Sequence, residues 1–351
     1  MNTEVPGTLS PRRSPSKGVR RPPVRGRRWK IRKIVIRALL VLIGLPVVLV
    51  LVALVSFYVS FYALHRADGT IVSSGQEREY LLHVPRNYDP TKPTPLVISL
   101  HAAAMWPATQ METSQWNRVA DEHGFLVVYP SGTTMRGGGT GVLPKIWLLS
   151  HDADLAANVT FISDLIDTLE AAYNIDPTRI YANGFSNGGA MAFVLSCTLS
   201  DRIAAVGTVS AAQDQRPWSW CADFPPVPLI NFHGTADLVP YDGGRVWASP
   251  KPFPSVQAWT ANWAQRNRCA PNPIESVAAE DVTRLEYTNC ANDAAVVLYT
   301  IREGGHTWPG GKPLAGWLLG RTSRSIDASS QMWAFFREHR GGVPEVKRPA
   351  S

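Results

Sequence analysis

The longest uninterrupted apolar run of the chain lies near its N-terminus. From Ala38 to Leu64 there are 27 residues without a charged side chain. As a helix, this run would span roughly 40 Å, which exceeds the ~30 Å thickness of a bilayer core. Trp29 precedes the run and its far end holds Phe57, Tyr58, Phe61 and Tyr62, which is typical of anchoring at a membrane interface. The pattern predicts a transmembrane signal-anchor helix over residues 34–64.

After Arg78 the pattern changes to short apolar runs that alternate with amphipathic segments. Apolar runs predict strands at residues 80–84, 95–101, 125–129, 179–182, 204–210, 227–232, 284–287 and 295–301. Helical spacing predicts helices at residues 158–173, 186–196, 256–266 and 325–337. Strands that are buried on both faces and separated by helices indicate an α/β class with a mostly parallel central sheet and helices on both faces.

Positive charge is concentrated at the N-terminus. The formal net charge is +7, but residues 1–37 hold twelve Lys or Arg and one Glu, which gives +11. The remaining chain therefore carries 7 − 11 = −4, so its composition gives no support to nucleic-acid binding. Residues 1–33 are interpreted as a basic, disordered cytoplasmic tail, and residues 341–351 as a disordered C-terminal tail.

The basic residues before the apolar run predict the orientation of the chain in the membrane. They indicate that the N-terminus stays in the cytoplasm and that the part of the chain after about His65 lies outside. The alternative is a signal peptide whose cleavage would release the remaining chain as a secreted protein.

Four cysteines fit such an oxidising location. None of them forms a Cys-x-x-Cys pair, so we expect no metal site. Three disulfide pairings are possible. We favour Cys197 with Cys221 and Cys269 with Cys290, because each pair closes a short loop, and four buried free thiols are the alternative.

A serine motif stands between a predicted strand and a predicted helix. Residues 184–188 read Gly-Phe-Ser-Asn-Gly, which matches the Gly-x-Ser-x-Gly turn that exposes a nucleophilic serine. The hydroxyl of Ser186 needs a base to remove its proton. The alternative is a glycine-rich turn in which Ser186 only caps the helix.

An acid and a base follow in the chain order that this motif requires. Asp237 lies on a loop past the predicted strand at 227–232, at the sheet edge where active sites of open α/β sheets occur. His306 follows the strand at 295–301, among glycines that let the loop deliver its side chain. The alternatives are a turn-forming carboxylate and a solvated loop histidine.

Backbone donors for a tetrahedral oxyanion should come from two loops. The N–H of Asn187, next to the serine, is the first candidate. The second is the N–H of Ala103, in the loop after the strand at 95–101. We expect His101 to organise this loop and not to act as a second base.

Taken together, these segments resemble the polyhydroxybutyrate-depolymerase-like and feruloyl-esterase-like branch of the α/β-hydrolases. The similar stretches lie at residues 173–181, 184–192, 200–206, 232–237 and 304–311, with Trp263, Asn267, Cys269, Tyr287 and Cys290. The resemblance covers about residues 70–340 and implies an α/β-hydrolase catalytic domain. It implies carboxylic-ester hydrolysis without a cofactor, a triad of Ser186, Asp237 and His306, and the two cysteine pairs favoured above.

The chain departs from this family at several positions. Ala102 stands where a glycine usually follows His101, which puts the donor assigned to Ala103 in question. Asn158 replaces an acid near a helix start, where it can still serve as a cap. Trp147 matches a family tryptophan, and Trp308 stands beside the predicted base. Both are candidates for substrate binding, and plain packing is the alternative for Trp308.

The expected activity is hydrolysis of an ester through an acyl-enzyme, outside the cytoplasmic membrane. Polyhydroxyalkanoate-type, hydroxycinnamoyl and short-chain esters all fit. One alternative is acyl transfer to a cell-envelope acceptor with the same triad, and another is a non-catalytic surface binding domain. The expected partners are an ester substrate and the membrane, and the sequence leaves the natural ester and the oligomeric state open.

Overall fold

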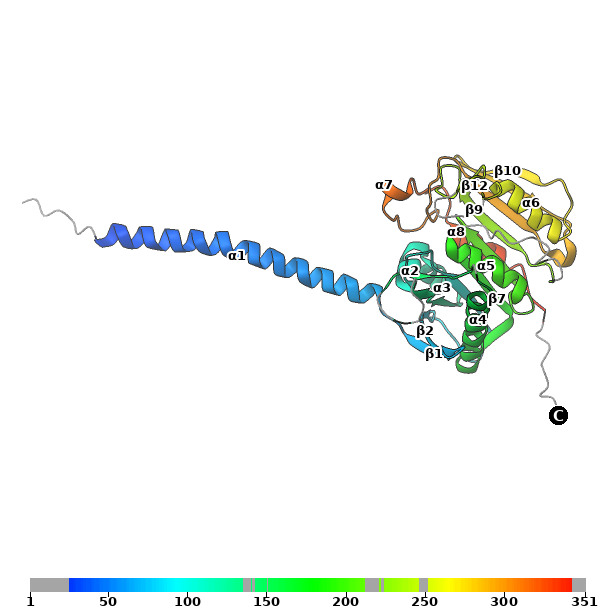
Figure 1. Cartoon of the computed structure of the whole chain (residues 1–351), viewed down its shortest axis with the longest axis horizontal. Helices are drawn as coiled ribbons and strands as arrows, with labels where there is room; N and C mark the ends of the chain where they lie inside the picture. The colour runs from blue at the N-terminus through cyan, green and yellow to red at the C-terminus, as the bar shows by residue number, and fades with distance from the viewer. Residues whose placement is uncertain are drawn as a thin grey trace, which may run out of the picture. The chain divides into compact units, whose positions relative to one another are not determined.

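The structure is a computed structural model that describes residues 25–134, 140, 143–149, 151–211, 221, 224–245 and 252–342. The chain divides into two units, Met1–Ser60 and Phe61–Ser351. Helix α1 runs from Arg25 to Leu64 (Figure 1). Its segment Trp29–Ser56 is long and apolar enough to cross a membrane, and a signal sequence near the N-terminus would meet the same criteria.

Helix α1 begins earlier than the sequence pattern indicated. The prediction of disorder up to residue 33 is wrong for residues 25–33, which are helical. The physical reason is that Arg, Lys and Trp are compatible with a helix interior, so the helix extends from the apolar run back through these basic residues without a break. The disorder predicted for residues 1–24 and 343–351 lies outside the described residues.

The second unit is built on a ten-stranded sheet with the order β1-β2-β4-β3-β7-β8-β9-β12-β11-β10. Its strands are β1 (Gly69–Ser73), β2 (Gln76–His83), β3 (Thr94–Leu100), β4 (Leu126–Pro130), β7 (Ile175–Phe185), β8 (Ala205–Val209), β9 (Leu229–Gly234), β10 (Ile274–Ala279), β11 (Val282–Tyr287) and β12 (Val296–Ile301). The six central strands, from β4 to β12 in this order, pair in parallel. Antiparallel strands flank them on both sides. The prediction of a mostly parallel sheet is therefore confirmed.

Helices cover both faces of the sheet and create two hydrophobic cores. One core packs α4 (Asp152–Ala172), α5 (Asn187–Thr198) and α6 (Val256–Arg266) against the sheet. The other core holds α2 (Pro107–Ser114), α3 (Trp116–His123) and α8 (Ala328–Phe336). Strand β3 feeds both cores, because alternate residues of a strand point to opposite faces. All seven of its residues are buried.

The start of α4 corrects a detail of the sequence interpretation. The helix begins at Asp152, six residues before the predicted start, so Asn158 lies inside it and does not cap it. The Asn158 side chain is buried instead. Its Oδ1 accepts a hydrogen bond from Arg78 Nη2 at 3.1 Å, and its Nδ2 donates to Leu148 O at 3.0 Å. The polar side chain therefore satisfies a buried guanidinium and a loop carbonyl.

Both favoured cysteine pairs form disulfides. Cys197 at the end of α5 is bonded to Cys221, and Cys269 after α6 is bonded to Cys290. The two bridges close sequence separations of 24 and 21 residues. Together with the apolar N-terminal helix, they fit a secreted or otherwise extracytoplasmic protein.

Removing one bridge should destabilise the fold by restoring entropy to the unfolded chain. For a loop of this length, we expect the Cys197→Ser/Cys221→Ser double variant to lose about 3 kcal/mol in the free energy of unfolding. Urea unfolding of both proteins at neutral pH measures the difference. Equal midpoints for the variant and the oxidised parent would contradict the expected contribution.

Candidate active site

Ser186 occupies a strained turn between β7 and α5. Its backbone dihedral angles are φ 53° and ψ −116°, a conformation that a residue with a side chain rarely adopts. Hydrogen bonds hold the turn in place: Ser186 N–H donates to Val209 O at 2.9 Å, and Ser186 O accepts the N–H of Gly189, also at 2.9 Å. The serine is thus fixed at the N-terminus of a helix, where the dipole favours negative charge.

The neighbouring strands bring Asp237 and His306 to the same edge of the sheet. Asp237 follows β9 by three residues, and His306 follows β12 by five. Because β7, β8, β9 and β12 are parallel neighbours, their carboxyl ends share one edge. A Cβ on Gly234 would lie only 2.1 Å from Gly304 O, so this glycine lets the aspartate and histidine loops touch.

The acid and the base are in direct contact. His306 Nδ1 lies 2.7 Å from Asp237 Oδ1, and Val239 N–H donates to the same oxygen, also at 2.7 Å. Since a carboxylate only accepts, Nδ1 carries the proton and Nε2 is left as the basic nitrogen. The imidazole ring lies 5.0 Å, centroid to centroid, from the ring of Phe185, the residue before Ser186. The structure therefore brings all three predicted positions to one edge.

The carboxylate of Asp237 is fully buried yet remains acidic. Burial by itself raises its pKa, but the hydrogen bonds from His306 and Ser210 and the electrostatic interaction with the two histidines, His306 and His233, together lower the pKa below the ordinary value. The group is consequently ionised at neutral pH. An ionised acid can orient the imidazole and stabilise its protonated form.

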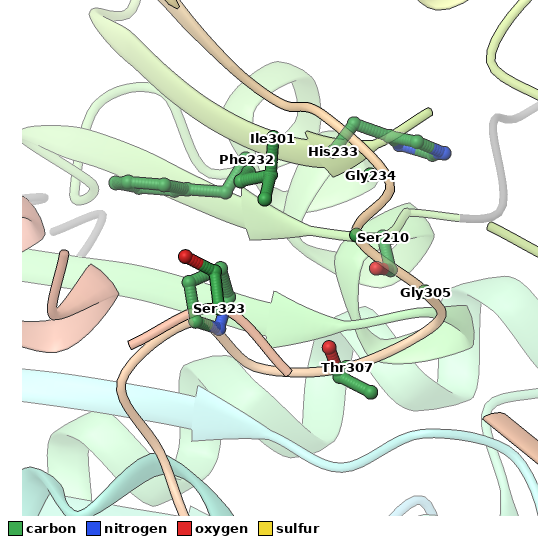
Figure 2. A pocket seen from close by; sticks show the side chains of 10 residues that line it. Ser210, Phe232, His233, Gly234, Ile301, Gly305, Thr307 and Ser323 are labelled. Atoms are coloured by element: carbon green, nitrogen blue, oxygen red, sulfur yellow. The ribbon is translucent and has the colours of Figure 1, made fainter. Parts of the chain in front are cut away.

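Two residues beside Asp237 escaped the sequence interpretation. His233 Nε2 lies 3.6 Å from Asp237 Oδ2 and donates to Val239 O at 2.9 Å, so it braces the aspartate loop. Ser210 has a positive φ of 49° at the end of β8. Both line a small crevice behind the histidine loop, together with Gly305 (Figure 2). The sequence signal that could have indicated His233 is its place four residues before Asp237, at the start of the same segment.

The loop after β3 is organised around His101, a fully buried side chain. Gly132 N–H donates to its Nε2 at 2.9 Å, so Nδ1 carries the proton and donates to Ala102 O at 2.8 Å. Burial lowers the pKa of His101 to about 4, and this ring is therefore neutral at physiological pH. These bonds occupy both ring nitrogens, which fits the organising role expected for His101.

The two expected oxyanion donors lie on backbones that touch. A Cβ on Gly188 would lie 2.3 Å from Leu100 O and 2.6 Å from His101 O, so the start of α5 packs directly against the end of β3. Within the described part of the chain, the N–H groups of Ala103 and Asn187 donate to no backbone acceptor. The methyl group of Ala102 is buried in the second core and does not project into the exposed loop.

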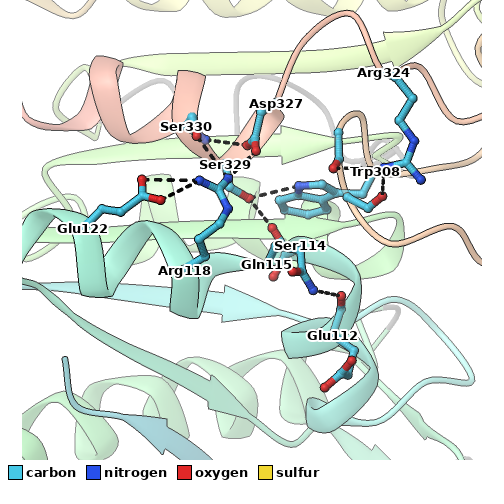
Figure 3. A network of polar contacts seen from close by, with 12 residues as sticks. Glu112, Ser114, Gln115, Arg118, Glu122, Trp308, Arg324, Asp327, Ser329 and Ser330 are labelled. Carbon is cyan, nitrogen blue, oxygen red and sulfur yellow. Dashed lines mark hydrogen bonds and ion pairs between the residues drawn. The ribbon is translucent and has the colours of Figure 1, made fainter. Parts of the chain in front are cut away.

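The two tryptophans proposed for substrate binding are buried, each with an exposed fraction of 1%. Trp308 Nε1–H donates to Ser329 Oγ at 3.1 Å, and Ser329 Oγ donates to Ser114 O at 2.6 Å (Figure 3). Nearby, Arg118 pairs with Glu122 and Asp327. Within the described part of the chain, neighbouring elements enclose both rings. The interpretation of Trp147 and Trp308 as substrate contacts is corrected, and the packing alternative fits Trp308.

The buried histidine of the loop should make the fold sensitive to acid. His101 has a pKa of about 4 in the folded chain and an ordinary value of 6.5, so the unfolded chain binds more protons between these values. The contribution of neutral His101 to the free energy of unfolding is fully present above pH 6.5. It is lost as the pH falls towards 4, and the loss for this group is about 3 kcal/mol. Chemical unfolding across this range should show a smaller pH slope in His101→Gln. An unchanged slope in that variant would assign the acid sensitivity to other groups.

Comparisons with known proteins show the family and the fold of this chain. A family model described as “Putative esterase” matches residues 71–280. “Feruloyl esterase B” of Piromyces equi is 31% identical over 247 residues, which cover 68% of this chain and 44% of that protein. “Putative esterase NocK” of Nocardia uniformis subsp. tsuyamanensis is 31% identical over 279 residues, which cover 74% of this chain and 79% of that protein. The solved acetyl xylan esterase from Aspergillus awamori superposes with a TM-score of 0.52 at 16% identity, over 76% of this chain and 98% of that one, and shows the shared fold.

Proposed function

Because this chain belongs to the esterase family whose model spans residues 71–280, we propose that it hydrolyses carboxylic esters through Ser186, His306 and Asp237. The observation that carries this proposal is the 2.7 Å contact between His306 Nδ1 and Asp237 Oδ1, at the sheet edge where Ser186 occupies its strained turn. The predicted α/β-hydrolase fold is the one in which such a triad operates.

The proposed reaction has two acyl-transfer steps. His306 Nε2 removes the proton of the Ser186 hydroxyl as its oxygen attacks the ester carbonyl, and the ionised Asp237 stabilises the resulting imidazolium. The N–H groups of Asn187 and Ala103 donate to the tetrahedral oxyanion, a contribution of about 3 kcal/mol per donor. The imidazolium then protonates the leaving alcohol. Water, activated by the same imidazole, releases the acid and restores the serine.

The proposed substrates are feruloyl or acetyl esters of carbohydrates, or simple short-chain esters. Support for the feruloyl esters comes from the activity that names a relative, the feruloyl esterase of Piromyces equi. The acetyl xylan esterase shares the fold alone. The polyhydroxybutyrate-depolymerase part of the earlier resemblance stays a prediction. We place the reaction outside the cytoplasmic membrane, with α1 as an uncleaved anchor, because the apolar run is longer than a signal-peptide core and two disulfides form in the catalytic unit.

Labelling with a fluorophosphonate probe tests the mechanism directly. The full-length protein should react stoichiometrically at Ser186, identified by peptide mass spectrometry, and should hydrolyse p-nitrophenyl acetate and methyl ferulate. Analysis of products in the presence of an added alcohol separates hydrolysis from acyl transfer to another acceptor. A folded protein that neither reacts with the probe nor releases acid from these esters is not the proposed hydrolase.

A further inference from the structure

A short segment, residues 145–147, contacts both loops that carry the proposed oxyanion donors. On one side it is hydrogen-bonded to the loop after β3. Ala104 N–H donates to Lys145 O at 2.8 Å, and Lys145 N–H donates to Met105 O at 3.2 Å. The loop takes part in these bonds through the N–H of Ala104, the residue after Ala103, and through the carbonyl oxygen of Met105. They hold the loop against β6 (Lys145–Ile146), the first part of this segment.

On its other side the segment is bonded to the residue after the nucleophile. Trp147 N–H donates to Asn187 Oδ1 at 2.8 Å, and Asn187 Nδ2 donates to Trp147 O at 3.1 Å. The side-chain amide of Asn187 thus pairs with a peptide unit as a neighbouring strand would. In addition, the indole Nε1–H of Trp147 donates to His101 O at 3.0 Å, next to the place where Gly188 meets β3.

The segment is itself firmly held. Its residues Lys145 and Ile146 pair with Thr134 and Thr133 of β5 (Thr133–Thr134). The Lys145 side chain has an exposed fraction of 1%, and its Nζ lies 3.5 Å from Glu79 Oε2. The Trp147 ring is equally buried and lies 5.3 Å from the His101 ring. Because the segment is held by these contacts, it can keep the two loops in a fixed position relative to each other.

We propose that residues 145–147 act as a strut that fixes the two halves of the oxyanion hole relative to each other. In this role Trp147 and the side chain of Asn187 are positioning residues, and the inference rests on the proposed ester hydrolysis. Donors from two separate loops stabilise an oxyanion only when they are already in place before charge develops. Ala104, the residue after Ala103, is exposed and holds a positive φ of 59°, and its N–H is held by Lys145 O.

The strut hypothesis predicts which kinetic constant changes. The oxyanion exists in the transition state and not in the bound ester, so a displaced donor lowers kcat and leaves KM nearly unchanged. A purely structural role would lower stability without this selective effect. A substrate contact would instead raise KM.

Two variants weaken the strut without removing a proposed donor. Trp147→Phe keeps a buried aromatic ring but loses the hydrogen bond to His101 O, and we expect kcat to fall about tenfold. Asn187→Ala keeps the backbone N–H but loses both bonds to Trp147, and we expect a fall of about a hundredfold. The matched control is Trp263→Phe. Trp263 lies on α6 and is also fully buried, and its Nε1–H donates to the carbonyl oxygen of Val227 at 3.1 Å.

The three variants and the full-length parent are compared by kcat and KM for p-nitrophenyl acetate, by the rate of fluorophosphonate labelling and by thermal unfolding. The proposal holds if Trp147→Phe and Asn187→Ala lose kcat and labelling rate at constant KM while Trp263→Phe loses only stability. It is overturned if both strut variants keep the parental kcat, if Trp263→Phe loses as much, or if only KM changes. If Trp147→Phe does not fold, Asn187→Ala decides the question by the same criteria. A parent that does not react with the probe refutes the esterase proposal itself, which is a separate outcome.

Discussion

Replacing Ser186 with alanine should lower kcat for p-nitrophenyl acetate by about 10⁶-fold, because Ser186 is the proposed site of the acyl-enzyme. KM should change little, since the hydroxyl contributes to bond formation more than to binding of the ester. Steady-state kinetics on protein free of contaminating esterases measures both constants. The residual rate then measures the rate enhancement that the oxyanion donors and substrate binding provide without the nucleophile.

The stability of Ser186→Ala should equal that of the parent. Alanine and serine both carry a Cβ, so the variant keeps the strained φ of 53° without relief. Ser196 provides a matched control, since its hydroxyl lies on the same helix, α5, but is buried and donates to Phe193 O at 2.7 Å. Ser196→Ala should keep its kcat. Turnover that survives in Ser186→Ala and is lost in Ser196→Ala would remove Ser186 from the mechanism.

The central sheet was predictable because its strands are buried on both faces. Runs such as residues 95–101 and 227–232 have no polar alternation, and such runs indicate parallel strands between helices. The edge strands were harder to predict. Strand β10 is almost wholly exposed, so its sequence shows no pattern of buried apolar residues. Helices α2 and α3 escaped prediction because Gln115, with a φ of 58°, breaks them into two eight-residue pieces. Neither piece is long enough to show a clear period.

The candidate triad positions were accessible from the sequence for a topological reason. Each of the three follows a buried strand, and parallel neighbours deliver their following loops to one edge. The surroundings of these positions were not accessible. Nothing in the sequence distinguishes a buried Trp147 that bonds to His101 O from an exposed one that contacts substrate. Nor does it show that the amide of Asn187 pairs with a peptide group far along the chain.

Replacing Asp237 with alanine should lower kcat by about 10⁴-fold, a smaller loss than that expected for Ser186→Ala. The loss has two parts. Alanine removes the charge that stabilises the imidazolium, and it removes the acceptor that keeps the proton of His306 on Nδ1. Without that acceptor, the proposed base loses its fixed tautomer and orientation.

Replacing Asp237 with asparagine separates these two parts, because the surrounding bonds dictate how the amide is oriented. Val239 N–H donates to Oδ1, so an amide oxygen is favoured at that position and can still accept from His306 Nδ1. The amide nitrogen would then replace Oδ2, the oxygen that neither Val239 N–H nor His306 Nδ1 contacts. We therefore expect Asp237→Asn to keep the imidazole tautomer and to lose only about 10²-fold in kcat, through the missing charge. Equal kcat values for the asparagine and alanine variants would show that the amide turns its nitrogen towards His306, and that Val239 does not control the orientation of the acid.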